Sequence, residues 1–173
     1  MVRGATSISR SRWTFTTRAI PGIDVQRAQW RNTLVYRFND DFQAGVEYNP
    51  LGNDVGPVAN WRLVRETKSR PAVIIGTSSD RIGTPTGRAY YVTVSKEIAD
   101  GLGVYVGAMY GEFEDKVRIP AGVSYRFDDH WSTLFAYDGV NGHPMVTYSW
   151  DNYSATFLMV GSKYPGISLG VGF

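Results

Sequence analysis

Apolar and polar side chains alternate along almost the whole of this 173-residue chain. The clearest run covers residues 117–127, and shorter runs cover 102–111 and 167–173. In the first run, one face carries Val117, Ile119, Ala121, Val123, Tyr125 and Phe127, and the other carries Arg118, Pro120, Gly122, Ser124 and Arg126. Because successive side chains of a β-strand point to opposite faces, this period of two predicts strands with one apolar face.

About 12 strands of this kind are expected, each followed by a turn. They cover residues 12–19, 28–38, 42–49, 58–66, 71–79, 87–97, 102–112, 116–127, 131–138, 143–151, 153–162 and 165–173. Residues 71–75 are apolar on both faces, so the fourth and fifth strands are ambiguous and a count of 10 stays open. The 11 Tyr, 8 Phe, 5 Trp and 19 Gly favour strands over helices.

Composition excludes several classes of function. The chain has no cysteine, so it forms no disulfide and no thiolate metal site. Its net charge of +2 is small and evenly spread, which argues against nucleic acid as a partner. No stretch reaches the roughly 18 apolar residues that a transmembrane helix requires.

The sizes of the residues on the two faces indicate which face points outward. The apolar face carries Trp, Tyr, Phe and Val in nearly every strand, whereas the other face mixes Gly and Ser with charged residues. A soluble sandwich or a lipocalin-like barrel would have to pack all the bulky residues around one small axis. In a barrel that spans a bilayer, these bulky residues face the lipid and need no room inside the barrel. We therefore predict an all-β, antiparallel up-and-down transmembrane β-barrel with short loops, as a single domain over 1–173 in which 1–11 is a flexible segment.

Three turns share one pattern, an aromatic residue, an Asn/Asp turn and a second aromatic residue. They are 36–42, 125–131 and 150–153. The flanking aromatic residues are expected at a membrane interface, where amphipathic rings are stable. With 12 strands starting at the periplasmic side, all three turns fall on that side. The predicted interface residues are Phe38, Phe42, Phe127, Trp131, Trp150 and Tyr153.

The end of the chain carries a resemblance to a family. Tyr164, Gly166, Leu169, Val171 and the terminal Phe173 follow the spacing of the C-terminal insertion signal of bacterial outer-membrane β-barrels. The chain therefore resembles a porin-like outer-membrane barrel, of no specific family that the sequence identifies. The resemblance implies recognition by the barrel-assembly machinery and pairing of the last strand with the first.

The expected location is the bacterial outer membrane, with the lipid bilayer and lipopolysaccharide as partners. Residues 1–4 do not open a secretory signal peptide, because no apolar segment follows Arg3. We expect that the signal is absent from this chain; the alternative is a chain that stays in the cytoplasm. The oligomeric state is left open.

Charged residues on the polar face are the functional candidates. The predicted pore-lining residues are Arg37, Glu47, Arg62, Tyr105, Arg118, Arg126 and Asp138. Rings of charge in a pore set its selectivity, although the same charges can instead pair and hold a small barrel rigid. The extracellular loops are expected to be short, about 4–9 residues, and to leave no material that constricts the channel.

The two histidines are candidate site residues. His130 and Ser132 have the His-x-Ser spacing of outer-membrane phospholipases and lipid A deacylases, but Pro144 stands where an orienting residue is expected. His143 and Asp138 are too few to form a metal site. We predict no catalytic residue, no metal and no cofactor.

The leading hypothesis is a narrow, weakly selective passive channel. One alternative is a non-conducting barrel that anchors a larger envelope complex. A third, less favoured, is a His/Ser lipid-modifying enzyme of the outer membrane.

Overall fold

A computed structural model describes residues 11–173, so the segment expected to be flexible lies almost entirely outside the described residues. The strands are β1 (Trp13–Ala19), β2 (Trp30–Arg37), β3 (Phe42–Asn49), β4 (Asp54–Val64), β5 (Ala72–Ser79), β6 (Arg88–Ala99), β7 (Leu102–Gly111), β8 (Lys116–Arg118), β9 (Ala121–Arg126), β10 (Trp131–Tyr137), β11 (Gly142–Trp150), β12 (Tyr153–Val160) and β13 (Tyr164–Gly172). Two short helices, α1 (Gln26–Gln29) and η2 (Pro50–Gly52), complete the described elements.

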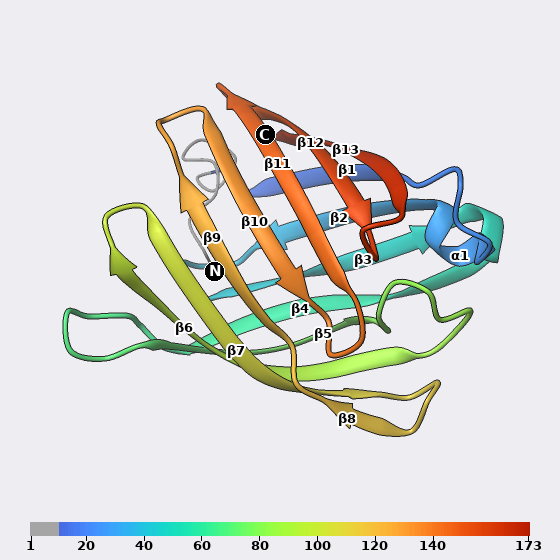
Figure 1. The fold of residues 1–173 in the computed structure, drawn as a ribbon, viewed down its shortest axis with the longest axis horizontal. Helices are drawn as coiled ribbons and strands as arrows, with labels where there is room; N and C mark the ends of the chain where they lie inside the picture. The colour runs from blue at the N-terminus through green and yellow to red at the C-terminus, as the bar shows by residue number, and fades with distance from the viewer. Residues whose placement is uncertain (1–10) are drawn as a thin grey trace.

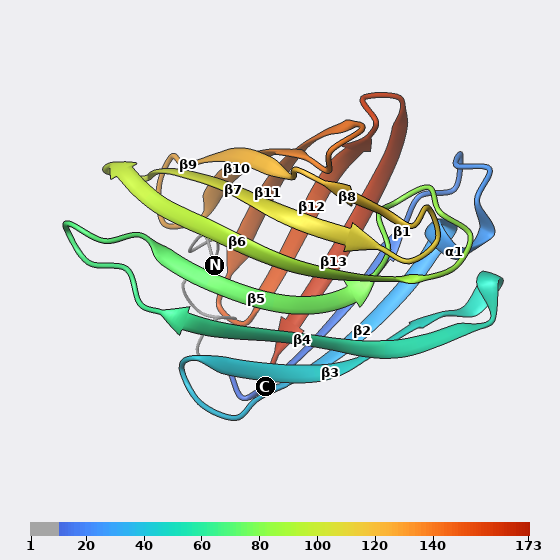
Figure 2. The same cartoon turned by 90° about the horizontal axis from the view of Figure 1, so that it is seen from below.

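The strands form one closed antiparallel barrel (Figures 1 and 2). Each strand pairs with its neighbours in the chain, and β1 pairs with β13 to close the ring. Closure satisfies the backbone groups that would otherwise lie on open edges, which is the condition for a sheet in lipid. The predicted up-and-down barrel is confirmed.

β8 and β9 together form one barrel strand that is interrupted at Ile119 and Pro120. The register is the same on both sides of the break, because β7 pairs Met109 with Arg118 and Val106 with Ala121. Pro120 lacks an N–H, which interrupts the ladder, but its carbonyl still accepts the Gly107 N–H at 2.9 Å. The barrel therefore has the 12 strands that the alternation predicts.

Most strand boundaries differ from the prediction by one or two residues, and two of the differences lie beside a short helix. Residues 50–57 were expected to be a loop, but η2 forms a tight turn that ends at Asn53, whose φ of 45° is left-handed, and β4 begins directly at Asp54. Residues 28–29, expected in a strand, belong to α1, and β2 begins at Trp30. At residues 54–57 the strand is thus longer than the prediction, whereas at 28–29 the alternation continues into a helical turn.

The bulky residues face outward. Trp61 is 52 % exposed, Val117 68 % and Phe157 54 %, whereas Glu47 on the opposite face is fully buried. This inversion of the soluble pattern is that of a barrel whose outer wall meets lipid. None of the helices within residues 11–173 is both long and apolar enough to span a bilayer.

Aromatic residues gather at one end of the barrel, which we call the girdle end. It carries the turns 38–41, 65–71, 100–101, 127–130 and 151–152. The rings of Phe38 and Phe42 stack at 5.3 Å, and those of Trp150 and Tyr153 at 5.7 Å. Trp131 contacts Tyr148 at 4.8 Å. The opposite end, which we call the mouth, carries the loops 20–29, 50–53, 80–87, 112–115, 138–141 and 161–163.

Candidate functional site: the barrel lumen

The inner wall carries most of the charged side chains of the strands. Glu47 of β3 lies at the centre of the largest cluster, fully buried. It forms ion pairs with Arg31 of β2 and with Arg88, whose Nη1 lies 2.9 Å from Oε1. Arg88 also binds Asp54 at 2.9 Å. A buried carboxylate that pairs with two guanidinium groups from other strands ties three parts of the barrel together.

Arg88 reaches this cluster by crossing Gly56. A Cβ at that position would lie 1.8 Å from the Cζ of Arg88, so no larger residue fits without moving the guanidinium. Tyr105 is placed in the same way, because a Cβ on Gly122 would lie 2.3 Å from its ring. Glycine on the inner wall therefore makes room for long side chains that cross the lumen.

Three other predicted pore residues are paired near the ends of the barrel. Arg62 binds Asp41 at 2.9 Å at the girdle end. At the mouth, Arg118 binds Glu114 at 2.9 Å, and Asp138 binds His143 at 3.0 Å.

Glu114 lies between two guanidinium groups at the mouth. The Arg81 guanidinium, 2.6 Å away, and that of Arg118 hold the pKa of the Glu114 carboxyl at about 2. The same ion pair raises the pKa of Arg81. Burial raises the pKa of Asp138, but the hydrogen bonds from His143, Asn141 and Val140 outweigh it and leave that pKa below its ordinary value. The acidic residues of this rim are thus held ionised by the groups around them.

Arg18, Arg37 and Arg126 make no ion pair within residues 11–173. Residues 1–10 contain no Asp or Glu, so the rest of the chain supplies no carboxylate either. The Arg18 Nε is buried and has no hydrogen-bond partner among the described residues. These three side chains leave the lumen with excess positive charge.

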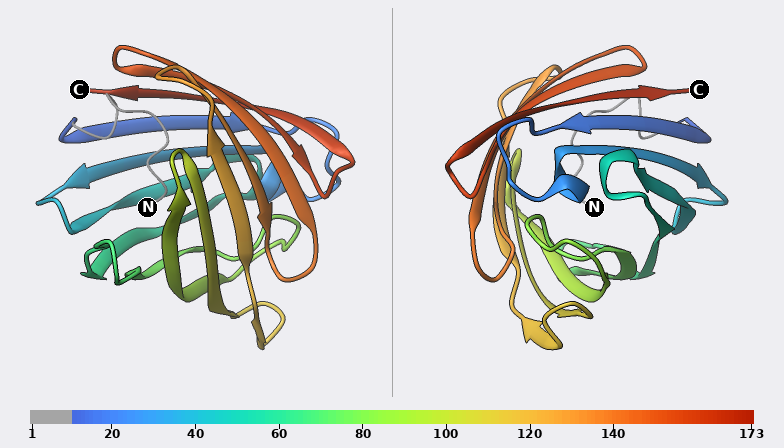
Figure 3. Two further views of the ribbon diagram at one scale, coloured as in Figure 1. Left: turned by 60° about the vertical axis from the view of Figure 1, so that its left-hand side comes forward. Right: turned by 90° about the vertical axis from the view of Figure 1, so that its right-hand side faces the viewer.

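At the mouth, α1 and the loop 80–87 lie within the ring of strands (Figure 3). Arg27 of α1 is 4 % exposed and joins the two segments. Its Nε donates to the Thr84 carbonyl at 2.9 Å and its Nη1 to the Gly87 carbonyl at 3.0 Å. Burial lowers the pKa of Arg27, partly offset by Asp54.

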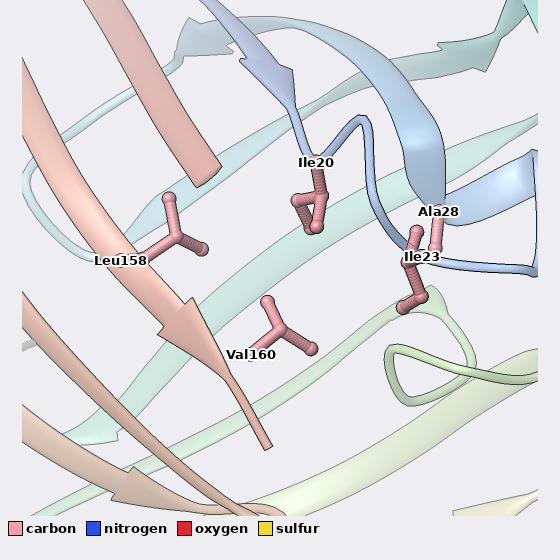
Figure 4. Packing of buried hydrophobic residues seen from close by; sticks show 5 residues of the cluster. All are labelled: Ile20, Ile23, Ala28, Leu158 and Val160. Carbon is pink, nitrogen blue, oxygen red and sulfur yellow. The ribbon is translucent and has the colours of Figure 1, made fainter. Parts of the chain in front are cut away.

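A small apolar cluster supports the same loop from the other side. Ile20, Ile23 and Ala28 pack against Leu158 and Val160 of β12 (Figure 4). All five are less than 7 % exposed. These contacts supply loop material inside the mouth, and the expectation that the loops do not narrow the channel stays a prediction. Loops 20–29 and 80–87 are short, yet both fold inward. Arg27 forms hydrogen bonds that join the two loops, and Ile20 and Ile23 pack against β12.

His130 and Ser132 do not form a hydrogen-bonded pair. The Nδ1 of His130 lies 2.8 Å from the Ser149 carbonyl, whereas Ser132 alternates with the exposed Trp131 and faces the lumen. Within residues 11–173, no group of three or more metal-ligating side chains gathers.

Sequence reasoning missed Arg18, Arg27, Arg31 and Arg88. A signal existed for Arg18 and Arg31, since both occupy inward positions of their alternating strands. Arg27 lies on a helix and Arg88 opens β6, so the alternation assigns neither of them to the lumen.

Comparison with known proteins shows the fold. No protein-family model and no curated protein matches the chain. Among solved structures, a "KdgM porin" aligns with a TM-score of 0.60 and 14 % identity over 93 % of this chain and 98 % of that one. A "KdgM porin in complex with disordered oligogalacturonate" aligns at 0.59 and 14 %, over 93 % and 97 %. The chain thus has the fold of a porin-like outer-membrane β-barrel over nearly its whole length.

Proposed function

We propose that this chain is a narrow passive channel of the bacterial outer membrane, weakly selective for anions. The observation that carries the proposal is the set of three inward arginines, Arg18, Arg37 and Arg126, without an acidic partner. An uncompensated positive charge on a low-dielectric wall raises the local concentration of anions and lowers that of cations.

The outer wall supports the membrane location. It carries an apolar groove of about 580 Å³ that is lined by residues of β3 to β8, among them Trp61 and Tyr110. Lipid acyl chains suit such a surface, and the girdle end supplies the interfacial aromatic residues. Lipopolysaccharide and the barrel-assembly machinery are the partners that this location requires.

The solute is proposed to be an organic anion that carries carboxylate groups. One structure of the same fold contains oligogalacturonate, an anionic sugar chain. A chain of carboxylates would meet the unpaired arginines one after another, and guanidinium groups bind carboxylates with good geometry.

The test is the reversal potential of single channels in a planar bilayer under a KCl gradient. We expect discrete current steps with a preference for chloride. Replacing Arg18, Arg37 and Arg126 together with glutamine should reduce that preference, whereas Arg70→Gln, on the exposed turn 65–71, should not. A preference for potassium in the wild-type channel would contradict the proposal.

The inward-folded loops 20–29 and 80–87 favour a second candidate, a non-conducting barrel that anchors an envelope complex. Inserted protein that shows no current steps would support this second function and remove the first.

A further inference from the structure

The strand register arranges polar side chains of the inner wall in two rows that cross the strands. The first row pairs, strand by strand, Arg126, Ser132, Thr147, Thr156, Ser168, Arg18 and Arg31. The second pairs Arg37, Gln43, Asn60, Gly76, Tyr91, Met109 and Arg118. Because barrel strands tilt by about 35–45°, a row across them climbs the wall. Each row therefore runs from an arginine at the girdle end to an arginine near the mouth.

We call Ser132, Thr147, Thr156 and Ser168 the hydroxyl row. These residues come from β10, β11, β12 and β13, four strands that lie side by side in Figure 1. All four are half-buried, and they alternate with exposed apolar residues such as Trp131, Val146 and Phe157. Their hydroxyl groups thus face the lumen and are not sealed from it.

The hydroxyl groups keep free hydrogen-bonding capacity. Thr147 and Thr156 bind each other at 2.8 Å, which uses one donor and one acceptor of the pair. Among residues 11–173, the side chains of Ser132 and Ser168 make no hydrogen bond. Since each hydroxyl offers one donor and two acceptor sites, most of the capacity of the row remains for a solute or for water.

The second row differs from the first. Tyr91 donates to Asn60 at 2.7 Å, so its main polar groups satisfy each other. Gly76 and Met109 contribute no polar side chain to it. Both rows therefore have an arginine at each end, but the residues between these arginines differ from one row to the other.

We propose that the hydroxyl row is the path that solutes follow through the channel, and that it favours solutes rich in hydroxyl groups. The inference rests on the proposed channel function. Neighbouring hydroxyl groups form hydrogen bonds of similar strength. A sugar can therefore exchange one hydrogen bond for the next as it moves, and no single position binds it tightly. Conduction requires this kind of weak, multi-site binding. The unpaired Arg126 and Arg18 stand at the two ends of the path and attract any acidic group that the solute carries.

The double variant Thr147→Val/Thr156→Val tests the path. Valine keeps the shape of threonine and removes both members of the hydrogen-bonded pair, so no buried group is left without a partner. Thr93→Val is the matched control, since Thr93 is also half-buried and inward-facing, on β6, outside both rows. Proteoliposome swelling measures the entry of a neutral disaccharide and of a polyethylene glycol of equal hydrodynamic size.

For the double variant, we expect the rate for the disaccharide to fall about 3- to 10-fold relative to the glycol, the effect of one or two hydrogen bonds. KCl conductance and the rate for the glycol should stay unchanged, as should the ratio in Thr93→Val. An unchanged ratio in the double variant, or an equal fall for both solutes, would overturn the path while leaving the channel intact. Wild-type protein that passes neither solute and no current would overturn the channel itself.

Discussion

Charged residues of the lumen form ion pairs that the sequence alone does not reveal. Glu47 is fully buried between Arg31 and Arg88. The sequence predicts that Glu47 faces inward, but it does not identify these two partners, because they lie on other strands. Long-range pairing depends on register and on room above Gly56, which alternation does not report.

The change Glu47→Gln should destabilise the barrel by about 2–4 kcal/mol, because two half-buried guanidinium groups would lose their carboxylate. It should also increase the preference for anions. Thermal unfolding in detergent and the reversal potential measure the two effects. Glu66→Gln, on the exposed turn 65–71, serves as the control. If Glu47→Gln unfolds at the same temperature as the wild type, the ion pairs of Glu47 contribute little to the stability of the barrel.

Acid should weaken the mouth. Since the folded-state pKa of Glu114 is lowered to about 2, its ion pairs stabilise the fold above the ordinary carboxyl pKa of about 4.3, and this contribution is lost as pH falls toward 2. The melting temperature of the wild type should fall over that range more steeply than that of Glu114→Gln. Parallel pH profiles for the two proteins would contradict this assignment.

At the scale of elements, the strands follow from local pattern and the loops do not. Most strands are visible in their own period of two. Residues 71–75 are apolar on both faces and lack this period, yet β5 (Ala72–Ser79) forms there. Pro120 interrupts hydrogen bonding without shifting the register. The inward fold of loop 20–29 depends on contacts of Arg27 with residues more than 50 positions away, and no local pattern contains that information.

Releasing this contact should widen the mouth. Arg27→Ala removes the hydrogen bonds to Thr84 and Gly87, so α1 and the loop 80–87 lose their link. We expect a higher single-channel conductance and a loss of about 1–3 kcal/mol in stability, from the carbonyls left without donors. Arg70→Ala is the control. A conductance equal to that of the wild type would show that these loops do not narrow the path.

At the scale of the whole molecule, closure and the outward apolar face define the protein. β1 and β13 close the ring, and the backbones of Trp13 and Phe173 exchange two hydrogen bonds, of 2.9 and 3.0 Å. Both features were predicted, because each strand repeats the same two-faced pattern and the terminal residue continues it. For the lumen, the sequence predicted which charged residues face inward. It did not predict which of them form ion pairs, because these pairs join strands that meet only in the closed barrel.

Deletion of Phe173 should reduce the amount of folded barrel in the outer membrane several-fold. The residue is 63 % exposed and ends the predicted insertion signal. Heat-modifiable migration of outer-membrane fractions measures the effect, and Phe135→Ala, an outward aromatic far from the end of the chain, is the control. Normal amounts of the truncated barrel would contradict the assigned role of the C-terminal residues.

The outward orientation of the tryptophans tests the central claim most directly. All five, Trp13, Trp30, Trp61, Trp131 and Trp150, lie on the outer wall and are 38–52 % exposed. In vesicles, lipids brominated along the acyl chain should quench most of the tryptophan fluorescence, and aqueous iodide should quench little. Strong quenching by iodide with none by brominated lipid, from protein that stays monodisperse without detergent, would contradict a membrane-spanning barrel.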